Sequence, residues 1–331
     1  MKKKILALVL ALAMTLVLAA CGGNNAGNNS GNNNNAGGSS GGDGGTKYAV
    51  ILKTKGTAFW NSMWDGVETY AKDNGLAVDL YAATSDTDYE GQLAILENCI
   101  NSGDYAGIAI APCSGVNLIS GVVTANNAGI TIVNIDEQFD EAEMTSQGGT
   151  CVGFVSSDNV SIGYMGAEYL CSLLEAGSEV GIVEGIAGNP SSEARASGAK
   201  AAFADGGMNI VADTSCDWDM QKALDTVSAW ITQYPNLKAI YCCNDGMAAG
   251  VRQAIANAGK TGDILLCGTD GDDDAIAAVS DGTMTATVAQ DPAGIGSTSL
   301  KILVDAVANP GNYTSVAAPE KTPVEALLVK Q

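Results

Sequence analysis

The feature that most constrains the fold is an alternation of short apolar runs with longer helical segments, which begins at residue 46 and continues almost to the end of the 331-residue chain. The apolar runs lack strict apolar-polar alternation, which is typical of strands buried on both faces of a parallel sheet. The helical segments supply the right-handed crossovers that parallel strands require. The expected strands are YAVILK, LAVDLYA, AGIAIA, ITIVNI, CVGFVS, EVGIVEG, NIVADTS, KAIYCC, DILLCG and MTATVAQ. So many strands exceed one comfortable sheet, and the sequence therefore predicts a parallel α/β protein with two lobes.

The N-terminal segment has the layout of an export signal, with three lysines followed by an uncharged apolar run from residue 5 to residue 20. The run is shorter than the roughly 20 apolar residues that a membrane-spanning helix needs. It ends in Leu-Ala-Ala-Cys, which resembles the lipobox of bacterial lipoproteins, and Cys21 would then become the lipidated N-terminus. The alternative is an ordinary signal peptide in which Cys21 has no role. Residues 22–45 contain mainly glycine, asparagine and serine, so residues 1–20 are predicted as the signal and 21–45 as a lipidated cysteine and flexible linker.

The composition argues against several function classes. The formal net charge of −21 makes nucleic acid an unexpected partner. The absence of histidine excludes Ser-His and Cys-His nucleophilic systems, and no phosphate-binding glycine loop is present. The eight cysteines after Cys21 have no CxxC spacing, so no metal site is expected. Several lie in apolar segments and are expected to be buried thiols, although export also permits disulfides.

Polar side chains stand where several predicted strands end. These are Lys53, Asp136, Glu137, Asn244, Asp270 and Gln290. Ligands of open α/β sheets lie beyond the carboxyl ends of the strands, so two facing lobes would bring these residues together. Aromatic rings at Phe59, Trp60 and Trp218 and a cation at Arg195 complete a set that suits a small polyhydroxylated ring. Each residue also has a structural interpretation: Asn244 could cap a helix, Asp270 could form a turn, and Phe59 could belong to the core.

Asp136 and Glu137 are the one pair of carboxylates that could serve as glycosidase acid and nucleophile. Adjacent residues of an extended strand point to opposite faces, so this pair is not expected to give enzymatic activity. No cofactor is expected either. If Lys53 and Glu137 end neighbouring parallel strands of one lobe, their charges can meet at the wall of the cleft.

Eight segments are informative together, and they are spread over nearly all of residues 46–331: KTKGTAFW, VNIDEQFD, VSSDNVSIG, EGIAGNPSSEARASGAKAAF, CDWD, KAIYCCNDGMAAGV, GTDG and MTATVAQDPAGIG. They resemble the ribose-type sugar-binding proteins of bacterial ABC importers, which are type I solute-binding proteins. Lys53, the Phe-Trp order and Asp136-Glu137 together look like the allose-binding members, because ribose-binding members carry arginine after that aspartate. One departure is Thr57-Ala58, where the family usually has Asn-Pro, so an amide expected to meet a ring hydroxyl is absent.

The resemblance implies the type I periplasmic binding protein fold: an α/β chain with two Rossmann-like lobes of parallel sheet joined by three hinge crossovers. It places residues 46–156 and 290–318 in the N-terminal lobe and residues 157–289 and 319–331 in the C-terminal lobe. Carried over by position, one wall of the cleft would contain Lys53, Phe59, Trp60, Asp136 and Glu137, the other Arg195, Trp218, Asn244 and Asp270, with Gln290 at a hinge.

The implied function is that of a lipid-anchored solute-binding protein that captures an allose- or ribose-like monosaccharide and delivers it to an ABC permease. The protein would act as a monomer at the outer face of the cell membrane or in the periplasm. Two alternatives remain open: a sugar sensor for a chemotaxis or kinase partner, and binding of another cyclic polyol or a furanosyl ligand. A sugar-responsive transcription regulator shares this core, but it needs a helix-turn-helix where this chain has an export signal and a linker.

Overall fold

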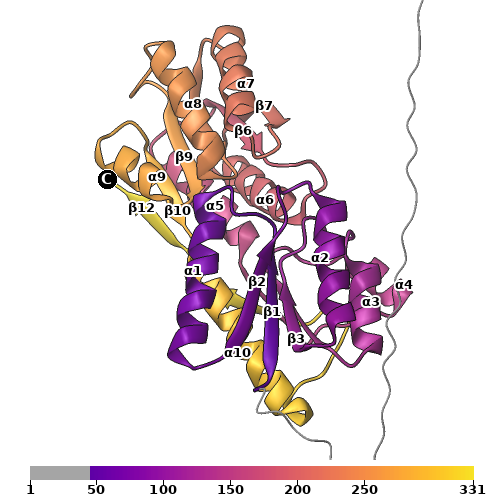
Figure 1. Ribbon diagram of the computed structural model, residues 1–331. Coiled ribbons are helices and arrows are strands. Elements are labelled where there is room, and N and C mark those ends of the chain that lie inside the picture. Colours follow the sequence, from indigo (N-terminus) through magenta and orange to yellow (C-terminus); the bar gives the residue numbers. More distant parts are fainter. Residues whose placement is uncertain (1–44) are drawn as a thin grey trace, which may run out of the picture. The chain divides into compact units, whose positions relative to one another are not determined.

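The computed structural model describes residues 45–331, which form two α/β lobes, each built on a six-stranded sheet (Figure 1). The predicted signal, Cys21 and the linker up to residue 44 lie outside the described residues. All ten predicted strands are present as β1 to β10, and the two-lobed parallel α/β architecture is therefore confirmed.

The first lobe contains a fully parallel sheet with the strand order β11-β5-β4-β3-β1-β2. Its elements are β1 (Lys47–Leu52), α1 (Ala58–Asp73), β2 (Ala77–Ala82), α2 (Tyr89–Ser102), β3 (Tyr105–Ile110), α3 (Ile119–Asn127), β4 (Thr131–Ile135), α4 (Glu141–Gln147), β5 (Gly153–Ser157), α10 (Pro292–Ala308), a 3-10 turn (Pro310–Asn312) and β11 (Lys321–Val324). One core cluster joins α1 and α10 to the sheet, and a second joins α2, α3 and α4 to it. Burial on both faces explains why these strands read as continuous apolar runs.

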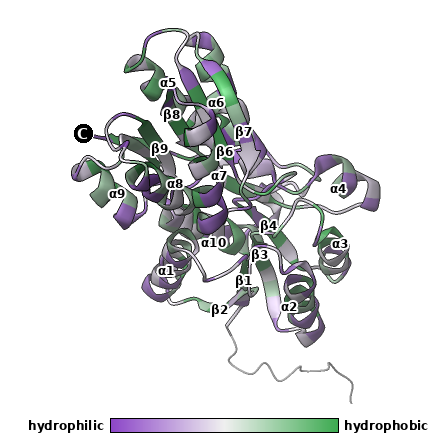
Figure 2. Ribbon diagram, turned by 90° about the horizontal axis from the view of Figure 1, so that it is seen from above, coloured by the Kyte–Doolittle hydropathy of each residue, from purple (hydrophilic) through white to green (hydrophobic). Residues whose placement is uncertain are grey.

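The second lobe repeats this architecture with the strand order β12-β10-β9-β8-β6-β7, in which β12 is antiparallel. Its elements are α5 (Asn159–Ser172), β6 (Glu179–Glu184), α6 (Pro190–Asp205), β7 (Asn209–Ser215), α7 (Met220–Gln233), β8 (Leu237–Cys242), α8 (Asp245–Asn257), β9 (Leu265–Asp270), α9 (Asp273–Ser280), β10 (Ala286–Ala289) and β12 (Leu327–Lys330). The strands β8 and β9 are coloured as hydrophobic in Figure 2, and their side chains belong to one large core cluster.

The chain passes between the lobes after β5, after β10 and after β11. Because β11 pairs with β5 in the first sheet, the last crossing follows Val324. The predicted boundary at residue 318 is wrong here. Both β11 and β12 are four residues long and lack a fully buried side chain, and β11 contains a proline, so they show no apolar run that predicts a strand.

Asparagine and aspartate side chains begin most of the helices, and they position helix N-termini beside the strand ends. Asn189 accepts a hydrogen bond from the Ser192 N–H at the start of α6, and Asn244 accepts one from the Met247 N–H at the start of α8. Thr57 caps α1 in the same way, through the Trp60 N–H. Such caps satisfy backbone donors that a helix leaves unpaired in its first turn.

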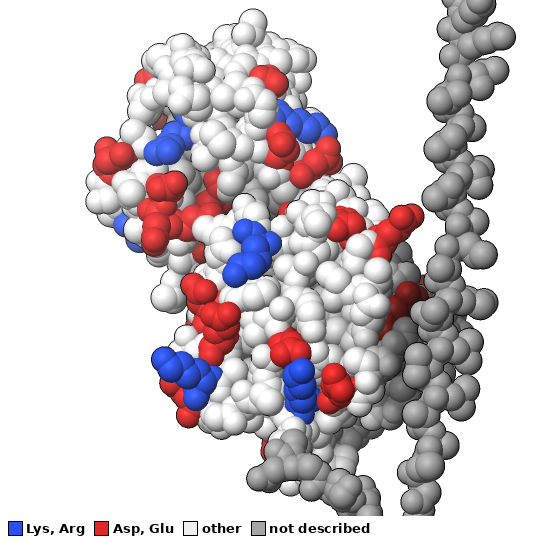
Figure 3. All heavy atoms as spheres, in the orientation of Figure 1, with Lys and Arg blue, Asp and Glu red and all other residues white. Residues whose placement is uncertain are grey.

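The surface charge and the helix lengths can be compared with the expectations from composition. On the face shown in Figure 3, carboxylates are spread over both lobes and no basic patch is visible. Between residues 45 and 331, no helix has the length and apolarity to cross a bilayer.

The eight cysteines from Cys99 to Cys267 are free thiols, and all but Cys171 are buried. They therefore serve as small apolar side chains of the core.

Candidate ligand-binding cleft

The predicted site residues converge on a small chamber that has walls from both lobes. The chamber holds about 100 Å³ and is lined by Lys53, Thr57, Phe59, Trp60, Asp86, Asp136, Glu137, Ser191, Arg195, Trp218, Asn244, Gly246, Asp270 and Asp272. Every residue predicted from the sequence is in this set except Gln290, which hydrogen-bonds Asp270 and lines an adjoining cavity of about 650 Å³. The smaller volume lies below the roughly 300–1,000 Å³ of sites for drug-sized ligands, so the chamber suits one small molecule.

Lys53 and Glu137 form an ion pair at the end of the first sheet. The Lys53 ammonium lies 2.6 Å from Glu137 Oε2, and both side chains are almost fully buried. The sequence is compatible with neighbouring strands for this pair, but the strands are not neighbours. Lys53 follows β1 and Glu137 follows β4, and β3 lies between the two strands. The long lysine side chain spans this extra strand. Burial opposes the charge of Lys53, but the Glu137 and Asp136 carboxylates outweigh it and raise the pKa of the ammonium.

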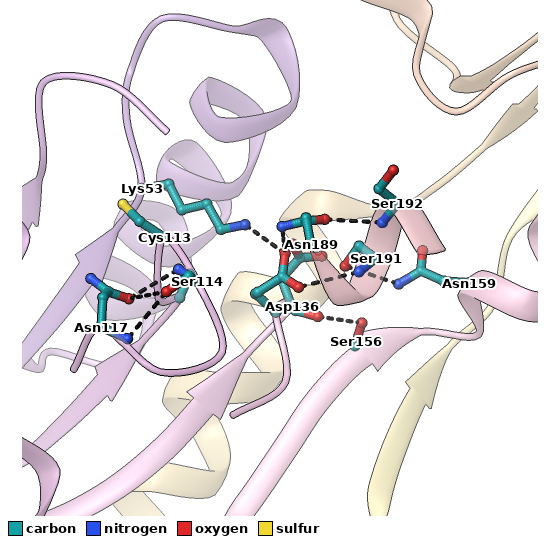
Figure 4. Close-up of polar contacts among 12 residues, drawn as sticks. Lys53, Cys113, Ser114, Asn117, Asp136, Ser156, Asn159, Asn189, Ser191 and Ser192 are labelled. Carbon is teal, nitrogen blue, oxygen red and sulfur yellow. Dashed lines mark hydrogen bonds and ion pairs between the residues drawn. The ribbon is translucent and has the colours of Figure 1, made fainter. Parts of the chain in front are cut away.

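Glu137 also reaches the second lobe. Asn189 donates to Glu137 Oε2 at 2.6 Å, and the Ser191 backbone N–H donates to Oε1 at 3.2 Å. Figure 4 shows the Lys53 side chain of the first lobe pointing toward Asn189 and Ser191 at the start of α6. Both oxygens of Glu137 are thus engaged by protein donors.

Asp136 offers an acceptor that the described residues do not use. Its backbone has φ of 57°, an uncommon conformation for an aspartate, and its carbonyl accepts from the Ser156 hydroxyl at 2.8 Å. Its Oδ1 atom is buried without a hydrogen-bond partner within residues 45–331. Burial raises the pKa of Asp136 to about 6. The positive charge of Lys53 offsets part of this effect, and the negative charge of Glu137 adds to it.

Arg195 is held by α6 against the end of the second sheet. It donates to Asn159 Oδ1 at 2.9 Å, to the Cys243 carbonyl at 2.7 Å and to Asp270 Oδ1 at 3.2 Å. Burial disfavours its charge, but Asp270 and the smaller contributions of other groups, Asp136 among them, together outweigh burial and raise the pKa of the guanidinium. The arginine is therefore a fixed, buried cation at the wall of the chamber.

Asp270 ends β9 with φ of 120° and receives a hydrogen bond of 2.6 Å from Gln290 Nε2. Burial raises the pKa of Asp270 to about 7. The charge of Arg195 offsets part of this rise, and the nearby Asp272 carboxylate adds to it. The remaining amide oxygen, Gln290 Oε1, is buried and has no partner in the described part of the chain. Buried polar atoms are normally hydrogen-bonded, so Asp136 Oδ1 and Gln290 Oε1 mark positions that a polar ligand can satisfy.

Aromatic rings supply the apolar surface of the chamber. Phe59 and Trp60 stand edge to face with ring centroids 5.0 Å apart, and the Lys53 ammonium lies 5.6 Å from the Trp60 ring centroid. Trp218, from the other lobe, has φ of 62°. Its ring lies so close to the Gly185 backbone that a Cβ atom at this position would overlap the indole.

Five lining residues were not predicted from the sequence: Thr57, Asp86, Ser191, Gly246 and Asp272. Ser191 and Gly246 lie in the first turns of α6 and α8, next to the caps Asn189 and Asn244, so strand ends followed by helix caps were a signal for them. Asp86 lies in the connection between β2 and α2, where nothing in the sequence indicates its orientation.

The site combines fixed cations, buried acceptors and aromatic rings, and the carboxylates of Glu137 and Asp270 are each tied to a cation and an amide. This arrangement is suited to holding a neutral polar molecule between two lobes, and together with the fold it defines a solute-binding protein of the two-lobed type. The chain belongs to the periplasmic binding protein family, because residues 48–311 match the family model described as a periplasmic binding protein domain.

Curated relatives support this assignment. The chain is 47% identical to the D-allose-binding periplasmic protein of Escherichia coli over 86% of its own length and 92% of the relative's. It is 34% identical to the D-ribose/D-allose-binding protein of Pseudomonas aeruginosa, covering 74% of this chain and 76% of the relative. These relatives are binding proteins rather than enzymes, which agrees with the sequence-based expectation.

A solved structure supports the fold in the same way. An ABC transporter periplasmic solute-binding protein from Actinobacillus succinogenes with bound D-allose has a TM-score of 0.80 and 28% identity, with 86% of this chain and 97% of that chain covered. The predicted type I periplasmic binding protein fold is confirmed.

Proposed function

We propose that the protein binds an allose- or ribose-like aldose in the chamber between its lobes and serves as the extracytoplasmic receptor of an ABC importer. The observation that carries this proposal is the buried, unpartnered acceptor Asp136 Oδ1 beside aromatic rings and fixed cations, with a second such acceptor, Gln290 Oε1, at the adjoining cavity. A sugar ring matches this set because its hydroxyl groups donate and accept while its C–H faces pack on aromatic rings.

The two lobes make complementary contributions to sugar binding. Lys53 and Asp136 of the first lobe and Arg195 and Asp270 of the second present charged groups, which make stronger hydrogen bonds than neutral ones. Phe59 and Trp60 on one side and Trp218 on the other would cover the faces of the ring, so that one sugar contacts both lobes at once.

The identity with the D-allose-binding relative supports an aldohexose such as D-allose as the ligand. Thr57 accepts the Trp60 N–H at 3.4 Å and begins α1, so the Thr57-Ala58 pair performs the local capping at this position. Thr57-Ala58 therefore contributes no side-chain amide to the chamber, and recognition of the ring hydroxyl that the family's Asn-Pro would meet depends on other groups.

Titration calorimetry with D-allose, D-ribose and myo-inositol tests the proposal. Replacing Trp218 with alanine removes a large contact area, and we expect sugar affinity to fall more than tenfold, on the order of 1.4 kcal/mol or above. Trp64→Ala is the matched control, because Trp64 lies outside the chamber, where it donates to Glu68 and packs under Lys55. Affinity unchanged in Trp218→Ala would contradict the proposed site.

We also propose that Cys21 carries the lipid anchor and that the folded lobes deliver sugar to a membrane permease. The Leu-Ala-Ala-Cys junction and the Gly/Asn-rich linker support this anchor. Cys21→Ser should release the protein from the membrane fraction or leave it unprocessed, as cell fractionation would show. A variant that is still cleaved and membrane-bound would refute the anchor without affecting the sugar site.

A further inference from the structure

Glu137 differs from the other chamber carboxylates, because protein donors occupy both of its oxygens. Oε2 accepts from Lys53 and from Asn189, each at 2.6 Å, and Oε1 accepts from the Ser191 N–H at 3.2 Å. The side chain is almost completely buried, with 1% of its surface exposed. Sugar recognition alone does not account for a carboxylate that is already this well supplied with donors.

The donors to Glu137 come from both lobes. Lys53 belongs to the first lobe with Glu137, whereas Asn189 and Ser191 form the beginning of α6 in the second. Apart from the hinge residue Gln290, which bonds to Asp270, the hydrogen bonds within residues 45–331 that join one lobe directly to the other are the two from Asn189 and Ser191 to Glu137. By contrast, Arg195 bonds to Asn159, Cys243 and Asp270, all within the second lobe.

The start of α6 is well suited to receive a carboxylate from the opposite lobe. Its first N–H groups point outward and carry the partial positive charge of the helix N-terminus. Asn189 has two tasks there, since its Oδ1 caps the Ser192 N–H at 2.9 Å while its Nδ2 donates across the cleft. Asn189 is buried, with 5% of its surface exposed, but it does not line the chamber.

We propose that Glu137, Asn189 and the Ser191 N–H form a clasp that stabilises the closed arrangement of the lobes, and that Asn189 is a positioning residue for ligand affinity. The clasp rests on the proposed sugar function only for its effect on affinity. If the ligand binds the closed form, its apparent affinity is its affinity for that form multiplied by the fraction of protein that is closed. A group that stabilises closure therefore strengthens binding without touching the ligand.

The variant that isolates the clasp is Asn189→Asp. Aspartate caps a helix as well as asparagine does, so α6 keeps its cap. The donor to Glu137 is lost, and a second carboxylate stands beside the first. The two carboxylates repel each other, and the Lys53 ammonium offsets this repulsion only in part. Opening the lobes relieves this repulsion. Asn209→Asp is the matched control, because it makes the same chemical change at an exposed position of β7 in the same lobe.

Two measurements test the proposal on full-length protein whose fold is checked by circular dichroism and melting temperature. We expect Asn189→Asp to weaken D-allose binding at least tenfold in calorimetry and to increase the radius of gyration of the sugar-free protein in small-angle scattering. Asn209→Asp should leave both values at those of the wild type. A sugar-free radius of gyration that is identical in Asn189→Asp and wild type would overturn the clasp.

A rescue variant separates the clasp from a general defect of α6. Glu137→Gln in the Asn189→Asp background restores one amide and one carboxylate across the cleft, with the donor now on the first lobe. This double variant should recover at least part of the compactness and affinity lost in Asn189→Asp, and failure to recover either would show that the two side chains do not act together. Wild-type protein that binds none of the sugars would refute the proposed function, while the sugar-free scattering comparison still decides the clasp.

Discussion

Three residues of the chamber, Asp136, Trp218 and Asp270, have positive φ, and the only other non-glycine example in residues 45–331 is Asp217 beside Trp218. Such conformations cost of order 1–3 kcal/mol each and persist where the surrounding structure requires them. Here each one turns a side chain at a strand or loop end toward the cleft. The concentration of strain at one place supports the assignment of this place as the functional site.

Asp136 provides a prediction about pH. Its folded pKa of about 6 lies above the model-peptide value of 3.8, so the folded protein binds this proton more tightly than the unfolded chain. The free energy of unfolding therefore loses a contribution as pH rises from about 4 to about 6. Asp136→Asn removes this dependence, and its stability relative to the wild type should increase by up to about 3 kcal/mol across that interval.

Urea unfolding of wild type and Asp136→Asn between pH 4 and pH 7 measures this effect. Parallel curves of stability against pH would contradict it. The same variant should bind sugar more weakly, because it replaces a charged acceptor with an amide, and a stability gain at pH 7 together with lost affinity would show that burial of this carboxylate serves binding.

Most of the residues that line the cleft could be predicted from the sequence, because strand ends converge in open α/β folds. Lys53 and Glu137 were expected to interact and do, at 2.6 Å, but the sequence could not show that β3 lies between their strands. Asn189 was not found, since its contact with Glu137 depends on how the two lobes approach each other. Local patterns carry no information about that approach.

At the scale of elements, pairs of helices pack at glycines. A Cβ atom on Gly163 of α5 would overlap the Arg195 carbonyl of α6, so this glycine sets the distance between the two helices. Because α6 carries both Arg195 and the start of the proposed clasp, the packing of α5 on α6 fixes part of the cleft wall. The alternation of apolar runs and helical segments in the sequence does not reveal this close approach.

Gly163→Ala should therefore force α6 away from α5. Overpacking of this kind destabilises by about 1–3 kcal/mol, and the displacement of Arg195 should also weaken sugar binding. Denaturant unfolding and calorimetry measure the two effects. Gly311→Ala is the control, because a Cβ atom there meets nothing within 4 Å. Wild-type stability in Gly163→Ala would show that the helices can separate without cost.

At the scale of the whole molecule, each lobe has its own hydrophobic core. One cluster fills the second lobe, and two clusters lie on the two faces of the first sheet. The lobes are joined by three chain crossings and by the contacts of the cleft. Separate cores connected by few contacts allow the lobes to unfold separately when no ligand joins them.

A sugar held by residues of both lobes should make their unfolding cooperative. Ligand that binds only the folded cleft stabilises it by mass action, and unfolding of either lobe destroys the site. In scanning calorimetry at increasing D-allose, we expect the lower-melting lobe to rise in temperature until both lobes unfold in one transition; if the sugar-free protein already shows one transition, it should move upward as a unit. A lower transition that keeps its sugar-free temperature at saturating sugar would mean that a single lobe holds the ligand. In that case the contacts proposed for Trp60 and Trp218 on opposite faces of one ring could not both exist.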